Sequence, residues 1–204
     1  MNKLTDIVKR YGIKGCLYKM ILRFGRLSGV TYIKYLAYFK SLPPAMDNNS
    51  LPQYQRMTMD NFRKQAKLDP QWLNNRKLNQ IESFINEPGY SYYGIYEEDK
   101  LICYGGISMD YDNFIHRKTD SGAAYLFDDY TNPLYRGKGL HKKIIEIREY
   151  ETWRQEKSIT FAYVLSSNLA SAKGFKRCRY VPRLKLIYKQ IGKNKPLERK
   201  IIKL

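Results

Sequence analysis

Two glycines, Gly137 and Gly139, stand in a short basic segment with Arg136 and Lys138, directly after an expected strand and before an expected helix. Glycine lets the backbone approach a ligand closely, and the N–H groups of a first helical turn point at an anion. The two basic side chains can add charge-assisted contacts. The segment therefore predicts a phosphate-binding loop.

The glycine spacing argues against two common phosphate-binding loops. A Walker loop needs Lys followed by Ser or Thr after its second glycine, and neither glycine here precedes that pair. A dinucleotide-binding fingerprint needs a third glycine at position 142, which is Lys142. Nucleoside triphosphates and dinucleotides are therefore disfavoured as ligands.

The run Arg136-Gly137-Lys138-Gly139-Leu140, preceded by Pro133 and a strand, resembles the acyl-coenzyme A loop of the GNAT superfamily of N-acyltransferases. That loop has the pattern (Gln/Arg)-x-x-Gly-x-(Gly/Ala). Arg136 and Gly139 match its first and fourth positions, whereas His141 stands where a small residue is usual.

A second, independent match lies downstream. The run 165–171 resembles the end of the family's fifth strand and its Asn-x-x-Ser/Ala helix start, with Asn168 as the asparagine. The family's Lys-x-Gly-Phe element would fall on residues 177–180, where Arg179 replaces the glycine and Tyr180 the phenylalanine. About residues 31–191 can be laid on the fold, and the specific matches are the two loops.

The resemblance implies acetyl-CoA or another acyl-CoA as co-substrate. The N–H groups of the 137–140 turn are expected to hold its pyrophosphate, and the end of the strand 123–131 is expected to pair with its pantetheine arm. The expected cofactor-binding residues are Tyr130, Thr131, Arg136, Gly137, Lys138, Gly139, Leu140, His141, Asn168 and Ser171.

The resemblance also implies direct attack by an amine on the thioester. A backbone N–H at the strand end, at Asp129, Tyr130 or Thr131, would polarise the thioester carbonyl. The amine needs a proton acceptor, because a protonated amine has no lone pair. Asp129 and Asp128 are the candidates. Since adjacent strand residues face opposite sides, at most one of the two side chains should point into the active-site cleft. Asp129 is preferred; the alternative is that both only cap or solvate a strand end.

The proton donor to the departing thiolate is unassigned. Many relatives have a tyrosine where this chain has Phe175. Tyr180 or a water could serve instead, or no acid is required, since the thiolate is a good leaving group. We expect His141 to pack or to lie beside phosphate rather than act as a base.

The remaining pattern predicts the elements that position these residues. Strands are expected over 31–42, 90–96, 101–109, 123–131, 158–165 and 181–191, and helices over about 58–67, 73–85, from 140 onwards and over 168–178. The expected fold class is α/β (α+β), with a GNAT-like central mixed, mostly antiparallel sheet flanked by helices. We expect this domain over 29–204, after a basic amphipathic helical extension over 1–28.

The net charge of +18 comes from the two ends of the chain. Residues 1–41 carry +8 and residues 173–204 carry +11, whereas 42–172 carry −1. The extension either lies on an anionic membrane surface or packs on its own domain. The acceptor is expected to be a small-molecule amine bound by residues 45–90. The basic ends favour an anionic acceptor, such as a nucleotide-linked amino sugar or a membrane-associated glycan precursor.

Two other classes of function stay open. The charge and the 19 tyrosines would suit a nucleic-acid-binding module, although the loop motif disfavours it. A non-catalytic acyl-CoA-binding protein would explain Phe175. No metal is expected from three cysteines without paired spacing and two histidines. No apolar run is long enough to span a membrane, so a cytoplasmic location is expected, with peripheral contact at the inner membrane surface as a further possibility.

Overall fold

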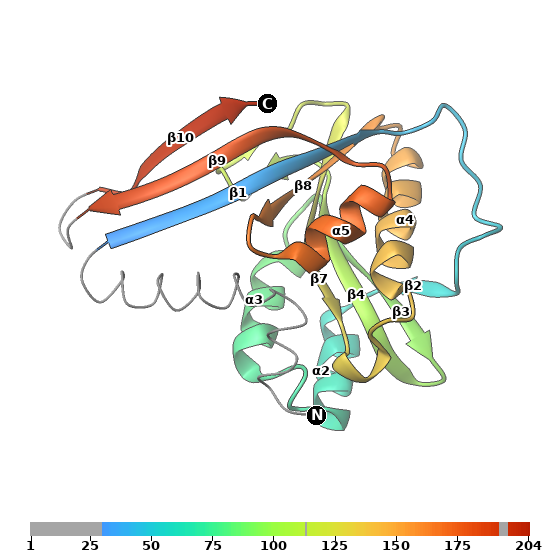
Figure 1. Cartoon of the computed structure of the whole chain (residues 1–204). Helices are drawn as coiled ribbons and strands as arrows, with labels where there is room; N and C mark the ends of the chain where they lie inside the picture. The colour runs from blue at the N-terminus through green and yellow to red at the C-terminus, as the bar shows by residue number, and fades with distance from the viewer. Residues whose placement is uncertain (1–29, 113, 192–195) are drawn as a thin grey trace. The chain divides into compact units, whose positions relative to one another are not determined.

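The structure is a computed structural model that describes residues 30–112, 114–191 and 196–204 (Figure 1). The chain divides into two compact units, which are described separately. Of the described residues, unit 1 contains 30–40, 162–191 and 196–204, and unit 2 contains 41–112 and 114–161. The predicted extension over 1–28 lies outside the described residues, so the domain boundary at residue 29 stays a prediction. No helix in the described ranges is long and apolar enough to cross a bilayer.

Unit 2 contains a sheet with two helical layers. Its strands lie in the order β8-β7-β4-β3-β2, and all neighbours are antiparallel except β7 and β8. The elements are β2 (Tyr54–Arg56), α2 (Met59–Leu68), α3 (Asn75–Ile85), β3 (Tyr90–Glu97), β4 (Lys100–Ser108), β5 (Tyr111–Asp112), β6 (Arg117–Lys118), β7 (Ala123–Thr131), η1 (Pro133–Tyr135), α4 (Leu140–Trp153) and the first residues of β8 (Ile159–Leu165).

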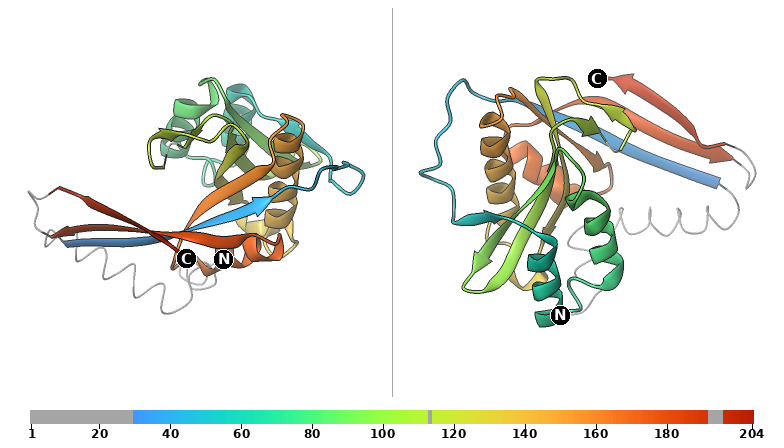
Figure 2. Two further views of the ribbon diagram at one scale, coloured as in Figure 1. Left: turned by 90° about the horizontal axis from the view of Figure 1, so that it is seen from above. Right: turned by 180° about the vertical axis from the view of Figure 1, so that it is seen from behind.

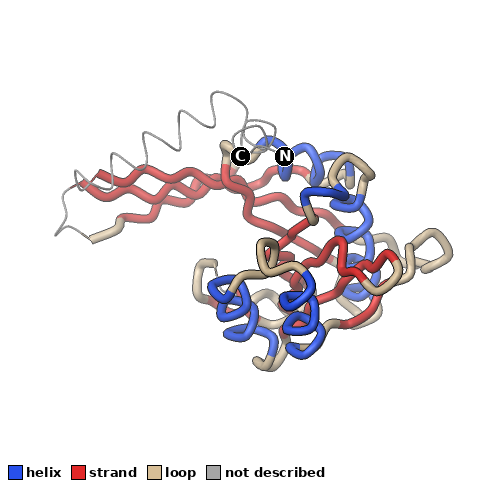
Figure 3. The backbone as a smooth tube through the Cα atoms, turned by 90° about the horizontal axis from the view of Figure 1, so that it is seen from below, coloured by secondary structure: helices blue, strands red, loops and turns tan. Residues whose placement is uncertain are grey.

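The two helical layers of unit 2 cover opposite faces of its sheet. In β4 the ring of Tyr104 meets Phe62 of α2, whereas Gly105, the next residue, faces Arg148 of α4. Since consecutive strand residues point to opposite faces, α2 and α4 lie on different sides. Helices α2 and α3 lie side by side, and α4 runs along the strands (Figures 2 and 3).

Local sequence signals place the helices of unit 2. Thr58, at the expected start of a helix, caps α2: its Oγ1 accepts from the Asn61 N–H at 3.3 Å, and its own N–H donates to Asn61 Oδ1 at 2.8 Å. Asn74 caps α3 through one bond, in which its Oδ1 accepts from the Lys77 N–H at 3.1 Å. Every longer helix and strand predicted in the described residues is present, which confirms the mixed, mostly antiparallel fold.

Unit 1 contains strands in the order β10-β9-β1-β8. Its N-terminal strand, β1, pairs antiparallel with the distant β9, from Val30 opposite Ile191 to Phe39 opposite Val181. The elements are β1 (Val30–Ser41, whose last residue belongs to unit 2), α5 (Leu169–Arg177), β9 (Val181–Ile191) and β10 (Glu198–Lys203), together with the end of β8.

Sequence reasoning missed the short elements. β2, β5, β6 and η1 have only two or three residues each, too few to show a period. β10 was missed because its sequence, Glu-Arg-Lys-Ile-Ile-Lys, is charged at four of its six positions and does not alternate polar with apolar residues.

Candidate active site

The loop before α4 has the geometry of an anion cradle. Gly137 and Gly139 both have positive φ angles, +89° and +76°, which other residues rarely adopt. Gly139 is the N-cap of α4, so no side chain caps the first N–H groups of that helix. A Cβ added at either glycine would meet nothing within 4 Å. The open space, the uncapped helix start and the basic side chains fit a pyrophosphate, with the positive end of the helix dipole beside it.

The two basic side chains of the loop both have partners, and those of Arg136 are residues that the sequence linked to the cofactor. The Arg136 Nε donates to the Thr131 carbonyl at 3.3 Å, and its guanidinium lies 5.8 Å from the ring centre of Tyr130. Lys138 Nζ is 3.8 Å from Glu97 Oε1. Binding of a pyrophosphate by either side chain would replace or extend these contacts.

The backbone of β7 is unpaired on one side near its end. The parallel ladder with β8 covers only Ala123 to Tyr125, although β7 continues to Thr131. Residues 126–131 therefore have no strand partner on that side among the described residues. This is the edge expected to pair with pantetheine, and Tyr130 and Thr131 lie on it.

A β-bulge in β7 contains the two aspartates. Tyr104 is paired with Tyr130 and Gly106 with Phe127, so Asp128 and Asp129 together stand opposite the single residue Gly105. Asp128 has φ +55°, an uncommon value for a non-glycine residue. The two side chains point to different helical layers, Asp128 to α3 and Asp129 to α4.

Asp129 belongs to a buried ion pair with α4. Its carboxylate contacts the Arg148 guanidinium, which is wholly buried, and lies 3.0 Å from His141 Nε2. Burial acts to raise the pKa of Asp129, but Arg148 and His141 outweigh it, and the pKa lies below its ordinary value. A carboxylate stabilised in this way is a weak proton acceptor. Leu140 and His141 are the first two residues of α4, and the His141 side chain faces Asp129.

Asp128 faces the opposite layer. It forms an ion pair with Lys77 of α3, and the Tyr92 hydroxyl donates to its Oδ2 at 3.2 Å. Burial raises the pKa of Asp128 above its ordinary value, although Lys77 and Tyr92 act in the opposite direction. A buried carboxylate with a raised pKa that already binds an ammonium is suited to accept a proton from an amine.

Aromatic side chains surround this ion pair. The ring of Tyr104 stacks on Tyr130 at a centroid distance of 6.0 Å, and Trp72 lies 6.0 Å from Tyr104 and 5.9 Å from Tyr130. Tyr104 Oη and Trp72 Nε1 are buried and have no hydrogen-bond partner among the described residues. We call Trp72, Tyr104 and Tyr130 the aromatic cluster.

Sequence reasoning found the aspartates and Tyr130 but missed Lys77, Trp72, Tyr92, Tyr104 and Arg148. Lys77 and Trp72 lie in the segment 45–90, which carries no readable motif. Tyr92 and Tyr104 read only as strand residues, and Arg148 as part of a helix. Their roles depend on long-range pairing that no local pattern contains.

Asn168 and Ser171 lie in unit 1, where they begin α5. The Asn168 side chain accepts from the Ser171 N–H at 3.3 Å, so it caps the helix. Phe175 is buried between Tyr38 and Tyr180, at 6.2 and 5.0 Å between ring centres. The predicted contacts of Asn168 and Ser171 with a cofactor stay predictions.

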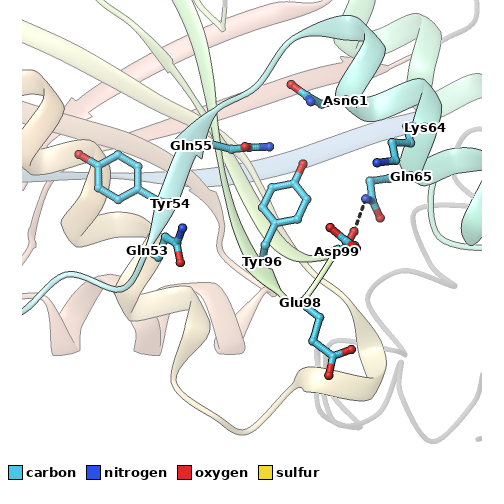
Figure 4. Close-up of a pocket in the computed structure, with 9 residues that line it drawn as sticks. All are labelled: Gln53, Tyr54, Gln55, Asn61, Lys64, Gln65, Tyr96, Glu98 and Asp99. Carbon is cyan, nitrogen blue, oxygen red and sulfur yellow. Dashed lines mark hydrogen bonds between the residues drawn. The ribbon is translucent and has the colours of Figure 1, made fainter.

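A separate polar pocket of about 390 Å³ opens beside β2, α2 and the turn after β3 (Figure 4). None of its lining residues belongs to the loop, the aspartate pair or the aromatic cluster. Gln65, for example, donates to the Asp99 carbonyl at 2.7 Å and serves to join α2 to that turn. The residues that line the pocket are Gln53, Tyr54, Gln55, Asn61, Lys64, Gln65, Tyr96, Glu98 and Asp99.

The sequence matches the model of the acetyltransferase (GNAT) family over residues 51–180. This is more than half of the chain, and the protein therefore belongs to the GNAT acetyltransferase family. The predicted resemblance is thereby confirmed, and acetyl-CoA is the co-substrate of this family. Among proteins with curated functions, none has a sequence that matches.

Solved structures share the fold. A GNAT-family acetyltransferase from Colwellia psychrerythraea superposes with a TM-score of 0.57 and 14% identity, over 87% of this chain and 62% of that one. A functionally unknown conserved protein from Staphylococcus epidermidis gives a TM-score of 0.57 and 11% identity, over 86% of this chain and 68% of that one. This chain spans less than two thirds of the Colwellia protein, and at these identities the likeness concerns the fold.

We predict that the double variant Arg136→Ala, Gly139→Asp abolishes the binding of acetyl-CoA. The aspartate would be strained at a positive φ and would place a negative charge in the cradle. Calorimetric titration of acetyl-CoA into both proteins checks this. Lys64→Ala, in the separate polar pocket, is the control and should bind like the parent; equal binding by the double variant would show that the loop is only a turn.

We also predict that Asp129→Asn destabilises the protein by about 3 kcal/mol at neutral pH, because Arg148 would be left buried without its counter-ion. A carboxyl whose pKa is lowered by folding stabilises the fold above its unfolded pKa of about 3.9, and the contribution is lost as the pH falls through the folded value. The difference from the parent should therefore shrink below about pH 4.

Urea unfolding of the parent and of Asp129→Asn, at neutral pH and below about pH 4, measures this difference in the free energy of unfolding. Asp110→Asn is the control, since Asp110 is exposed and its ion pair with Lys157 should contribute less than about 1 kcal/mol. A neutral-pH loss for Asp129→Asn no larger than that of the control would contradict a stabilising Asp129–Arg148 pair.

Proposed function

We propose that the protein transfers an acetyl group from acetyl-CoA to a primary amine by direct attack, with Asp128 as the proton acceptor. The observation that carries this proposal is the buried Asp128 carboxylate, which binds the side-chain ammonium of Lys77 and belongs to the same strand as the unpaired edge of β7. The preference for Asp129 at the sequence level is replaced on electrostatic grounds, because Arg148 and His141 hold its pKa low.

Each group of the site then has a defined task. The loop 136–140 binds the pyrophosphate of acetyl-CoA, which supplies the activated acyl group. A backbone N–H of the unpaired segment, at Tyr130 or Thr131, donates to the thioester carbonyl and stabilises the negative charge that develops there. Asp128 accepts the proton of the incoming ammonium, and Tyr92 holds the carboxylate in place.

An amino sugar is the acceptor that we propose, because its amino group carries the positive charge that the Asp128 carboxylate can bind. Trp72 and Tyr104 are buried, at 7% and 0% exposure, so they pack beside the ion pair and offer no face to the acceptor. The basic ends of the chain support an anionic acceptor, such as a nucleotide-linked amino sugar.

The first prediction from this proposal concerns Asp128. Asp128→Asn should lower kcat by about 10²- to 10⁴-fold, since the amide cannot accept a proton. Tyr92→Phe removes a hydrogen bond that favours the charged carboxylate, so the pKa of Asp128 rises and the acid limb of the kcat/KM profile moves to higher pH.

The pH profiles of the parent and Tyr92→Phe, measured with an amine acceptor, check this. Tyr54→Phe is the matched control: it loses a hydrogen bond to Glu151 at 2.6 Å and should leave the acid limb unmoved. An unmoved limb in Tyr92→Phe together with an active Asp128→Asn would assign the proton transfer to another group.

The second prediction concerns the acceptor and the membrane. Neutralising the seven Lys and Arg residues of 1–28 should lower turnover of a nucleotide-linked amino sugar more than that of free glucosamine, and weaken association with anionic liposomes. Steady-state kinetics and liposome sedimentation measure the two effects. If neither changes, the anionic acceptor and the peripheral membrane contact are both wrong, whereas the transfer itself is not affected.

A further inference from the structure

The amine bound by Asp128 belongs to the protein itself. Lys77 Nζ contacts Asp128 Oδ1 and donates to Gln80 Oε1 at 3.2 Å. The side chain of Lys77 is 20% exposed and that of Asp128 is 10% exposed, so the pair is largely shielded from water. The structure thus holds a primary amine against the carboxylate that we propose as the proton acceptor.

This amine also lies close to the edge where acetyl-CoA is proposed to bind. Lys77 Nζ is 5.9 Å from the ring centre of Tyr104, and that ring stacks on Tyr130. Tyr130 is one of the residues on the unpaired edge of β7, two positions after Asp128. The lysine side chain is long and flexible, so the position of Nζ relative to this edge can change by rotation about its carbon–carbon bonds.

The pairing of Lys77 with Asp128 can make the lysine amine a nucleophile. A proton can pass from the Lys77 ammonium to Asp128 and leave a neutral amine with a lone pair. Burial raises the pKa of Asp128, so this carboxylate can hold the proton that it accepts. An amine held beside an activated acyl group reacts at a high effective concentration.

We propose that Lys77 is a site of self-acetylation, modified within the same molecule by bound acetyl-CoA when no acceptor is present. This inference rests on the proposed function. The ammonium gives one proton to Asp128, the Nζ–carbon bond forms and the carbon–sulfur bond breaks. The second proton of the nitrogen goes to the departing thiolate, which leaves as coenzyme A thiol, and the proton on Asp128 passes to water. Lysine becomes acetyl-lysine, with no other reactant.

Self-acetylation would change the site. The acetylated side chain carries no charge, so Asp128 loses its counter-ion. An incoming ammonium would then no longer compete with Lys77 for the carboxylate. Lys77 is thereby also a determinant of how tightly acceptor amines bind.

The experiment uses the full chain incubated with acetyl-CoA alone, followed by intact-mass measurement and peptide mapping. We expect one acetyl group per molecule, with Lys77 modified at least about tenfold faster than Lys142, an exposed lysine of α4. The rate at Lys77 should not depend on protein concentration. Lys77→Arg should lose this modification and keep the slow background at Lys142.

Two variants distinguish enzymatic from spontaneous acetylation. One is the loop double variant Arg136→Ala, Gly139→Asp, and the other is the single variant Asp128→Asn. In each of them the acetylation rate at Lys77 should fall to the rate at Lys142. Equal rates in the parent and the loop variant, or a rate that scales with protein concentration, would overturn the inference.

The two proposals can fail separately. If acetyl-CoA binds in calorimetry, an added amine is acetylated and Lys77 is not enriched, the inference is wrong and the proposed function stands. If acetyl-CoA neither binds nor modifies any lysine above background, the proposed function itself is wrong, and the inference with it.

Discussion

The candidate site depends on one buried charge. Arg148 of α4 is wholly buried, where an unpaired guanidinium would be very unfavourable. It donates to the carbonyls of Gly106 and Phe127 at 2.9 and 3.3 Å and pairs with Asp129. These partners lie on both strands at the bulge, so the need to satisfy one side chain fixes the local register of β4 and β7. Gly105 is required there because a Cβ would lie 2.8 Å from the guanidinium carbon.

Two adjacent aspartates acquire different properties from this arrangement. Asp129 faces the permanent positive charge of Arg148, and Asp128 faces the layer of α3, where its partner is Lys77. The pKa of Asp129 is lowered and the pKa of Asp128 is raised. The proposed division of labour between the two carboxyl groups rests on which helix each one meets. The same bulge leaves Tyr130 stacked in the aromatic cluster, next to the unpaired edge.

The sequence was sufficient for the elements whose signals are local. Thr58 marks the start of a helix, and Gly137 and Gly139 mark a loop whose positive φ angles favour glycine. The family followed from that loop and the Asn168 motif. Strand alternation indicated that Asp128 and Asp129 face opposite sides, but not which groups each one meets. Their partners are distant in the chain, since Lys77 lies 51 positions from Asp128 and Arg148 lies 19 positions from Asp129. Pairing over such distances leaves no local signature.

The pairing of β1 with β9 constrains how the chain can fold as it is synthesised. Unit 2 is one continuous segment, so all its contacts can form once residue 161 has left the ribosome. Val30 must instead wait for Ile191, and the loop they close contains the whole of unit 2. A pre-folded insert shortens the effective loop and lowers the entropy lost on closing it. Topology therefore favours an order of assembly in which unit 2, with the loop 136–140 and the aspartate pair, forms first and the strands of unit 1 join last.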